Sequence, residues 1–441
     1  MDIFIRVAQL LLSLSILVLL HEMGHYVAAR IFKTRVEKFY LFFNPWFSIF
    51  KFKKGDTEYG LGWLPLGGYV KIAGMIDESM DKEQMKKPPK PDEFRSKKAW
   101  QRLIIMIGGV VVNVFLAYVI YIFMLTIWGE QYLPNKNVKD GIAIDPMMTE
   151  IGLQNGDKIL KVDGEEVIDF FKISTMILLE TAETITVERN NEIKELAIDP
   201  VFIKKIMDEE RANLITPRIP MIIGEIPDTS ANINSGIEIG DKIIGIDSSF
   251  FNFQDEFKAI ATEKKGTQVE LAVLRNTDTL FMPVLINDDA KIEVFLMTDL
   301  DSLFGTETKE YTFFEAIPAG FKKTWVEFGN YVKQFRLIFN KDIKGYENVG
   351  SFISIGKIFP TEWDWYFFWK ITAFLSIMLA FLNILPIPAL DGGHVMFLLI
   401  EMIIGRKLSD RAMEIAQYIG FFLVMALVVL ALFNDFMRHV F

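Results

Sequence analysis

Two histidines and a glutamate near the start of the chain have the residue types and spacing of a metal site. The motif His21-Glu22-Met23-Gly24-His25 directly follows the apolar run Ile16–Leu20. In a helix the two imidazoles lie on one face, one turn apart, so they can hold a single Zn²⁺ while Glu22 acts as general base on a metal-bound water. Because the segment has the composition of a membrane span, where ionisable groups are costly, we expect a functional site. The alternative is a pair of polar residues that cap a helix at the bilayer edge.

A second polar cluster lies far along the chain, in the segment Asn383–His394. Two prolines and two glycines predict that the helix breaks there, and unwound backbone at membrane depth is tolerated only when buried in protein or lining a wet cavity. Asp391 can supply the third ligand of a His₂Asp site, which leaves a fourth position open, as catalytic zinc requires. Asn383 can donate a hydrogen bond to a developing oxyanion. The alternatives are a helix-capping role for Asp391 and a structural role for Asn383. His394 is a possible further ligand, but we expect it to support a ligand from behind or to pack, because the glycine pair turns it away.

The composition limits the chemistry of the protein. The 441 residues include no cysteine and only four histidines. A thiol nucleophile, a thiolate metal ligand and a disulfide framework are therefore excluded, and only His, Asp and Glu remain to hold a transition metal. Half of the chain is hydrophobic (51%) and aromatic residues are abundant (13%), which is typical of a membrane protein with soluble parts.

Four segments are long and apolar enough to span a membrane, at roughly residues 4–31, 103–128, 365–385 and 413–433. The loop between the first two spans, residues 30–102, carries sixteen Lys and Arg against nine Asp and Glu, and a short basic loop follows the third span. The positive-inside rule places both loops in the cytosol and the region between the second and third spans outside. We therefore predict a multi-pass α-helical membrane protein with four transmembrane helices in a lipid bilayer, with its metal motif near the cytosolic side.

The first cytosolic loop is too apolar to be left in water. Its aromatic run Phe39–Phe47 predicts a hairpin at the membrane interface, and residues 59–72 predict an apolar strand with several glycines. An exposed strand edge beside a metal site can bind an extended peptide through main-chain hydrogen bonds, although an ordinary packed hairpin is an equal alternative. The candidate substrate-binding residues are Leu64, Leu66, Gly67, Gly68 and Tyr69.

The region between the second and third spans contains an internal repeat. Residues 152–163 match residues 236–247 at a constant offset of 84 residues, and each copy pairs a Gly-Asp turn with a short alternating strand. An offset of this size predicts two small α+β domains, which resemble tandem PDZ domains and so imply peptide or chain-end ligands.

The repeats are followed by apolar residues at helical spacing between Phe321 and Phe339, which predict an amphipathic helix on the outer membrane face, with a core helix as the alternative. The predicted organisation is 1–128 for the first two spans with the metal motif, 129–218 and 219–300 for the PDZ-like domains, 301–362 for the amphipathic helix region, and 363–441 for the last two spans with Asp391.

Together these motifs resemble the site-2 protease family of intramembrane zinc metalloproteases. The resemblance rests on the His21–His25 motif in the first span, on Asn383-x-x-Pro-x-Pro-x-Leu-Asp391-Gly, on the Leu66–Tyr69 segment and on Gly109-x-x-x-Asn113 in the second span. It covers essentially the whole chain. One departure is a serine and a phenylalanine after Gly350, where the family often has a proline, and this puts only the local turn geometry in doubt.

The resemblance implies hydrolysis of a peptide bond within or next to a transmembrane helix. The implied ligands of zinc are His21, His25 and Asp391, with Glu22 and Asn383 as catalytic groups. The implied substrates are single-span membrane proteins such as an anti-sigma factor already trimmed outside the membrane, and possible further ones are remnant signal peptides. The implied location is a bacterial inner membrane, with the PDZ-like domains in the periplasm, and no nucleic acid is involved.

Two rival functions come from other classes. A membrane-anchored PDZ scaffold with a structural metal site would tolerate Glu22→Gln. A metal transporter would need polar groups at several depths, whereas here they gather at one end of the spans.

Overall fold

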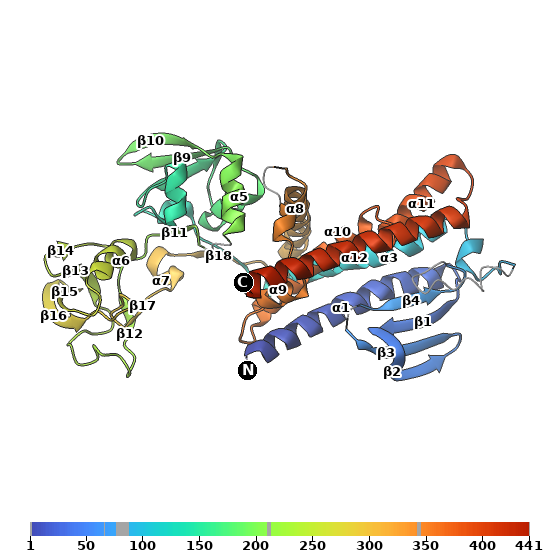
Figure 1. Ribbon diagram of the computed structural model, residues 1–441, viewed down its shortest axis with the longest axis horizontal. Helices are drawn as coiled ribbons and strands as arrows, with labels where there is room; N and C mark the ends of the chain where they lie inside the picture. The colour runs from blue at the N-terminus through green and yellow to red at the C-terminus, as the bar shows by residue number, and fades with distance from the viewer. Residues whose placement is uncertain (1, 66, 76–87, 210–212, 342–344, 441) are drawn as a thin grey trace. The chain divides into compact units, whose positions relative to one another are not determined.

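The structure is a computed structural model that describes residues 2–65, 67–75, 88–209, 213–341 and 345–440. The chain divides into two compact units, which are described separately (Figure 1). The membrane unit contains residues 1–129, 310–340 and 344–441, and the repeat unit contains residues 130–309 with 341–343.

Four long apolar helices in the membrane unit are candidate membrane spans, as predicted. They are α1 (Asp2–Ile31), α3 (Ala99–Trp128), α10 (Trp365–Ile384) and α12 (Asp410–Val440). Helix α3 packs against both α1 and α10. Where α1 meets α3, a Cβ on Gly24 would collide with the Gly108 backbone, so the small residues allow the two helix backbones to approach closely.

A four-stranded sheet follows α1 in the sequence. Its strands are β1 (Val36–Leu41), β2 (Phe43–Lys54), β3 (Thr57–Leu64) and β4 (Tyr69–Ile72), in the order β2-β3-β1-β4. The prediction of a hairpin at Phe39–Phe47 is wrong: the run is divided between β1 and β2, which both pair with β3 rather than with each other. Residues 59–72 form two separate strands rather than one. Strand β4 pairs with β1 and is one of the two edge strands of the sheet, with β2 at the opposite edge.

The helical backbone is interrupted after α10, as the prolines and glycines predict. Helix α10 ends at Ile384, and a separate short helix, α11 (Asp391–Ile404), begins at Asp391. Gly392 and Gly393 lie directly on the backbone of residues 384–388, where a Cβ would collide with it. The glycines therefore set the position of the first turn of α11, although the sequence analysis did not separate this helix from its neighbours.

The predicted amphipathic helix is α8 (Phe313–Ile338), and it packs along α3 and α10. The rings of Phe328, Tyr331 and Phe335 contact that of Phe381 on α10, whereas Phe321 and Trp325 remain exposed. One face of α8 thus belongs to the helix bundle, which agrees with the alternative of a core helix for that face. The other short helices among the described residues of the membrane unit are η1 (Phe94–Ser96), η5 (Gly345–Asn348) and α9 (Phe352–Ile358).

The repeat unit contains two sheets with the same strand order. In the first, β7 (Lys158–Val162) lies between β8 (Glu165–Glu166) and β9 (Thr184–Arg189), and β10 (Glu192–Ala197) forms the far edge. In the second, the corresponding strands are β13 (Lys242–Ile246), β14 (Ser249–Phe250), β15 (Gln268–Arg275) and β16 (Asp278–Leu285). A helix follows the first two strands of each copy, α4 (Ile173–Leu179) or α6 (Gln254–Glu263). The internal repeat of the sequence is therefore a repeat of structure.

Short strand pairs complete the repeat unit. They are β5 (Glu130–Tyr132) with β18 (Glu307–Lys309), β6 (Ile142–Ile144) with β11 (Ile215–Pro217), and β12 (Ile223–Glu225) with β17 (Phe295–Leu296). The remaining helices are η2 (Asn135–Asn137), η3 (Pro146–Ile151), η4 (Phe170–Lys172), α5 (Pro200–Asp208) and α7 (Leu300–Phe304). The pair β5–β18 brings together the two ends of the segment 130–309.

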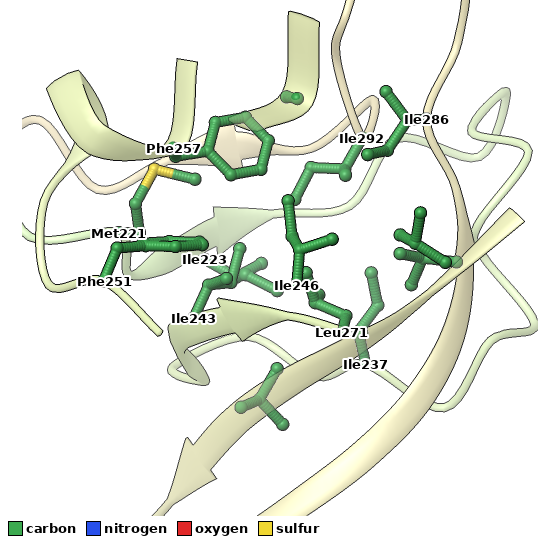
Figure 2. Packing of buried hydrophobic residues seen from close by; sticks show 14 residues of the cluster. Met221, Ile223, Ile237, Ile243, Ile246, Phe251, Phe257, Leu271, Ile286 and Ile292 are labelled. Atoms are coloured by element: carbon green, nitrogen blue, oxygen red, sulfur yellow. The ribbon is translucent and has the colours of Figure 1, made fainter. Parts of the chain in front are cut away.

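The second repeat has a core of its own, in which aliphatic side chains from the sheet pack against Phe257 of α6 (Figure 2). Ile223, Ile243 and Leu271 in this core are fully buried. Because this core is contiguous and lies within one copy of the repeat, the second copy has the character of a small α+β unit.

Candidate metal centre

Three side chains that were predicted to bind a metal converge at one point in the membrane unit. His21 and His25 lie one turn apart on α1, and Asp391 is the first residue of α11. The Nε2 atoms of the two histidines are 3.3 Å apart, and Asp391 Oδ2 is 3.2 Å from each of them. Within the described ranges, these residues form the one cluster of three or more His, Asp or Glu side chains with the spacing of a metal site.

The dimensions of this triangle suit zinc. Ligands about 2.0–2.1 Å from a tetrahedral Zn²⁺ lie about 3.3–3.4 Å from one another, which agrees with the observed separations. Both imidazoles are buried, and Asp391 Oδ2 is buried without a hydrogen-bond donor among the described residues. A buried carboxylate oxygen needs a cation or a hydrogen-bond donor, and a metal ion shared with the two imidazoles would meet that need, so the arrangement fits a bound metal ion.

Helix α3 supports both histidines from one face. His25 Nδ1 lies 2.9 Å from the carbonyl oxygen of Ile105, and His21 Nδ1 lies 3.1 Å from the amide nitrogen of Asn113. Gly109 lies between these two positions, and a Cβ there would come within 2.5 Å of His21 Cε1 and His25 Nε2. The three residues are spaced four apart, so successive turns of one helix hold the pair of rings.

Glu22 projects beside the two histidines and faces the edge strand β4. The backbone N–H of Val70 donates a hydrogen bond to its carboxylate. Gly68, just before β4, has no room for a side chain, because a Cβ would lie 2.7 Å from Val18 Cγ1 and 3.4 Å from Glu22 Cγ. The glycine therefore allows the backbone leading into β4 to lie directly against the His21–His25 turn of α1.

Asn383, near the end of α10, also reaches the site, because its Nδ2 lies 3.3 Å from His21 Nε2. His394 lies elsewhere, with its Nε2 3.1 Å from the side-chain nitrogen of Gln417 on α12. The structure thus brings Glu22 and Asn383 to the candidate ligands and keeps His394 out of the cluster, as expected from the sequence.

The candidate substrate-binding residues lie around the β3–β4 connection. Leu64 ends β3, Gly67 has a φ of 136°, and Tyr69 begins β4 with its ring stacked on those of Tyr40 and Phe43. Leu66 lies outside the described residues.

Apart from Asn383, the polar residues of α3 and α10 near the site have no role that could be assigned from the sequence. Asn113 supported the family resemblance without an assigned role. Ser376 Oγ donates a 2.8 Å hydrogen bond to the Asn113 carbonyl oxygen, and Thr372 Oγ1 donates a 3.0 Å one to Ser13 Oγ on α1. These residues are fully buried in spans that are otherwise apolar, and that contrast is the signal that could have identified them.

A helical membrane protein in which a His-Glu-x-x-His turn meets an aspartate from another helix has the arrangement of the membrane-embedded metallopeptidases. The chain matches the family model of peptidase family M50 over residues 9–427, and it belongs to that family. Peptidase family M50 is zinc-dependent, so the protein is an intramembrane zinc metalloprotease.

Relatives of similar length support this assignment. The regulator of sigma E protease of Haemophilus influenzae is 28% identical over 452 residues, which cover 97% of this chain and 98% of the relative. The regulator of sigma-E protease RseP of Escherichia coli is 28% identical over 460 residues, with 98% of each chain covered. Protease RseP of Yersinia pestis is 27% identical over 465 residues, which cover 99% of this chain and 100% of the relative.

Proposed function

We propose that the protein cleaves a peptide bond within or next to the transmembrane helix of a single-span membrane protein. In this proposal His21, His25 and Asp391 bind the zinc ion and Glu22 is the general base. The observation that carries the proposal is the triangle of ligand atoms, 3.2–3.3 Å on each side, with Glu22 on the same turn of α1.

Each residue of the site has a distinct task in the reaction. Zinc bound there supplies the means to acidify a water molecule and to polarise the scissile carbonyl group. Glu22 takes a proton from the water and passes it to the leaving amine. Asn383 donates a hydrogen bond to the oxygen on which negative charge develops, for which its position beside His21 is suitable.

The edge strand β4 is the proposed binding site for the substrate backbone. A peptide bond in a helix is not accessible to attack, so the substrate must become extended, and pairing with an edge strand stabilises an extended segment. Strand β4 suits this task because Val70 contacts Glu22 directly. We assign Leu64, Gly67, Gly68 and Tyr69 to this binding region, together with Leu66 from the sequence.

The names of the relatives support a substrate class. Because these relatives are named regulators of sigma E, we propose an anti-sigma-factor-type substrate that another protease has already trimmed outside the membrane, with remnant signal peptides as a further class. The repeat unit, as two periplasmic PDZ-like domains at 129–218 and 219–300, would exclude untrimmed substrates and bind peptides or chain ends. The excess of basic residues in the loop 30–102 supports a bacterial inner-membrane orientation with the site near the cytosol.

The test is cleavage of a single-span test substrate by the purified full-length protein reconstituted in lipid vesicles. We expect Glu22→Gln to reduce the cleavage rate by about 100-fold or more, in the range of general-base contributions. Asp391→Asn and a zinc chelator should each abolish cleavage. Glu192→Gln, which changes an exposed carboxylate on β10, is the matched control and should cleave at the wild-type rate.

Normal cleavage by Glu22→Gln would contradict the proposed mechanism. If Glu22→Gln bound zinc and cleaved like the wild type, and if chelation lowered the unfolding temperature of the protein, the metal would be structural, as in a membrane-anchored PDZ scaffold.

A further inference from the structure

Asn113 is a buried polar residue in the middle of α3 whose side chain faces a candidate zinc ligand. Its Nδ2 lies 3.1 Å from His21 Nδ1, and its Oδ1 is buried without a hydrogen-bond partner among the described residues. The residue is fully buried, and its backbone carbonyl oxygen accepts a hydrogen bond from Ser376 of α10. An amide oxygen in this position needs a donor, because an unsatisfied polar atom at membrane depth is costly.

The chemistry of the imidazole ring decides which amide atom must face His21. To bind zinc through Nε2, a neutral histidine must carry its proton on Nδ1, and the neighbouring group must then accept a hydrogen bond. An NH₂ group facing Nδ1 favours the opposite tautomer, which places the proton on Nε2. A half-turn of the amide about its terminal torsion exchanges the two atoms and places Oδ1 against the Nδ1–H. The same half-turn gives the oxygen a donor and moves the NH₂ group to the position that the oxygen leaves, so the orientation of the amide is decided by the tautomer that His21 needs to bind zinc.

His25 provides an internal comparison for this argument. Its Nδ1 faces the carbonyl oxygen of Ile105, a group that can only accept, so this ring is already held in the tautomer that presents Nε2 to the metal. Ile105 and Asn113 lie on the same face of α3, on either side of Gly109, which touches both rings. Helix α3 would thus supply one acceptor to each histidine, from the backbone in one case and from a side chain in the other.

We propose that Asn113 is a positioning residue for zinc, and that its Oδ1 accepts a hydrogen bond from His21 Nδ1–H and so fixes the tautomer and orientation of that ligand. The inference rests on the proposed function, because it requires His21 to bind the metal. It adds a residue of the second span to a site otherwise built from α1 and the α10–α11 region.

The test is the zinc affinity of the full-length protein in detergent micelles, measured by competition with a chromophoric chelator. Asn113→Leu has a similar volume but no acceptor, and we expect it to weaken zinc binding by about 10–100-fold, the usual effect of losing such a partner. Asn113→Asp restores an acceptor and should bind zinc close to the wild-type affinity. If the leucine variant does not purify in folded form, Asn113→Ala removes the acceptor with a smaller side chain and should show the same loss.

Two further measurements separate positioning from packing. Thr324→Val removes a buried hydroxyl on α8 that bonds only within its own helix, and it should leave zinc affinity unchanged. With Co²⁺ in place of zinc, the visible spectrum of Asn113→Leu should differ from that of the wild type in shape and intensity, because a misoriented imidazole changes the coordination geometry. The Asn113→Asp spectrum should resemble that of the wild type.

The role of Asn113 and the assignment of His21 as a zinc ligand are contradicted by different results. Equal zinc affinity and equal Co²⁺ spectra for the wild type, Asn113→Leu and Asn113→Asp would refute the role of Asn113 and leave the proposed function intact. Unchanged zinc affinity in His21→Ala would instead refute the assignment of His21 as a ligand, and with it the proposed function. A loss of affinity in both Asn113→Leu and Asn113→Asp, with lower unfolding temperatures of the metal-free proteins, would show that Asn113 acts through packing and would also overturn the inference.

Discussion

Buried carboxylates in the two units of the molecule are compensated in different ways. In the repeat unit, Asp157 receives hydrogen bonds of 2.6 and 2.7 Å from the Arg189 guanidinium group, and Asp241 receives two of 2.8 Å from Arg275. In the membrane unit, the buried Oδ2 of Asp391 faces two imidazole nitrogens instead, and it has no hydrogen-bond donor in the part of the chain that the structure describes.

This difference separates structural from functional charges. A buried carboxylate is tolerated when a cation and hydrogen bonds replace the water that it has lost. In the repeats the chain supplies the cation itself, and it does so in both copies, as expected of a device that stabilises a recurring fold. At Asp391 the facing groups are two imidazoles, which are common metal ligands, so under the proposed function the compensating cation is a bound metal ion.

The largest expected effect follows from replacing the carboxylate in each setting. We expect Asp391→Asn to weaken zinc binding by more than about 100-fold, beyond the effect of changing an outer partner, and to change the unfolding temperature of the metal-free protein little. Asp157→Asn should have the reverse effect, with zinc affinity retained and the first repeat destabilised. Chelator competition and thermal unfolding of the full-length variants measure both quantities. If Asp157→Asn lost zinc as completely as Asp391→Asn, the distinction between the two regions would be wrong.

A large effect is also expected from Gly109→Ala, which adds a single methyl group to α3. The new Cβ would come within 2.5 Å of atoms in both His21 and His25, so at least one ring must move and the ligand triangle must open. Zinc affinity and peptide cleavage should both fall sharply. Gly329→Ala on α8 is the matched control, because nothing lies within 4 Å of its added Cβ and alanine is about 1 kcal/mol more favourable than glycine in a helix. Wild-type zinc affinity in Gly109→Ala would contradict the role of α3 in holding the rings.

The sequence predicted those parts of the structure that leave a local pattern. Long apolar segments gave the four spans, and the four-residue spacing of His21 and His25 gave a shared helix face. The constant offset between two Gly-Asp turns gave the repeated sheets. Asp391 was identified because an acid in a broken apolar segment is costly and is rarely kept there without a function.

The remainder could not be predicted because it depends on contacts between distant segments. The carbonyl oxygen that orients His25 belongs to Ile105, and no sequence pattern marks a backbone atom as a partner. The four-residue spacing of Gly109 and Asn113 places them on one face of a helix but does not say what that face contacts. Only the structure shows that both residues lie against the histidines of α1. Likewise, the division of residues 59–72 into β3 and an edge strand β4 depends on the pairing of β4 with β1, which an apolar run does not reveal.

A smaller effect, confined to the repeat unit, is expected from Arg189→Leu. Without the guanidinium group, Asp157 would be buried with only a backbone hydrogen bond from Gln154, and such uncompensated charges cost about 3 kcal/mol. Hydrogen exchange of β7 and β9 in the full-length protein should therefore accelerate, while zinc affinity remains that of the wild type. Unchanged exchange in both strands would show that the Arg189–Asp157 ion pair contributes little to the stability of the first repeat. The contrast between a structural carboxylate in the repeats and a metal-binding one at Asp391 would then not hold.

The smallest expected effect is the pH dependence of the second repeat. Burial raises the pKa of Asp241, but hydrogen bonds from Arg275 and from the backbone N–H of Glu238 outweigh it and hold the pKa below its ordinary value. The unfolded chain therefore binds a proton at this position more readily than the folded one. The contribution to stability is complete above the unfolded pKa of about 3.9 and is lost as the pH falls through the folded value. Hydrogen exchange of β13 and β15 should accelerate on acidification below about pH 4, beyond the intrinsic pH dependence of exchange. In Asp241→Asn this acceleration should be smaller, because no carboxylate remains to be protonated there, whereas an identical acid response in the two proteins would exclude Asp241 as its source.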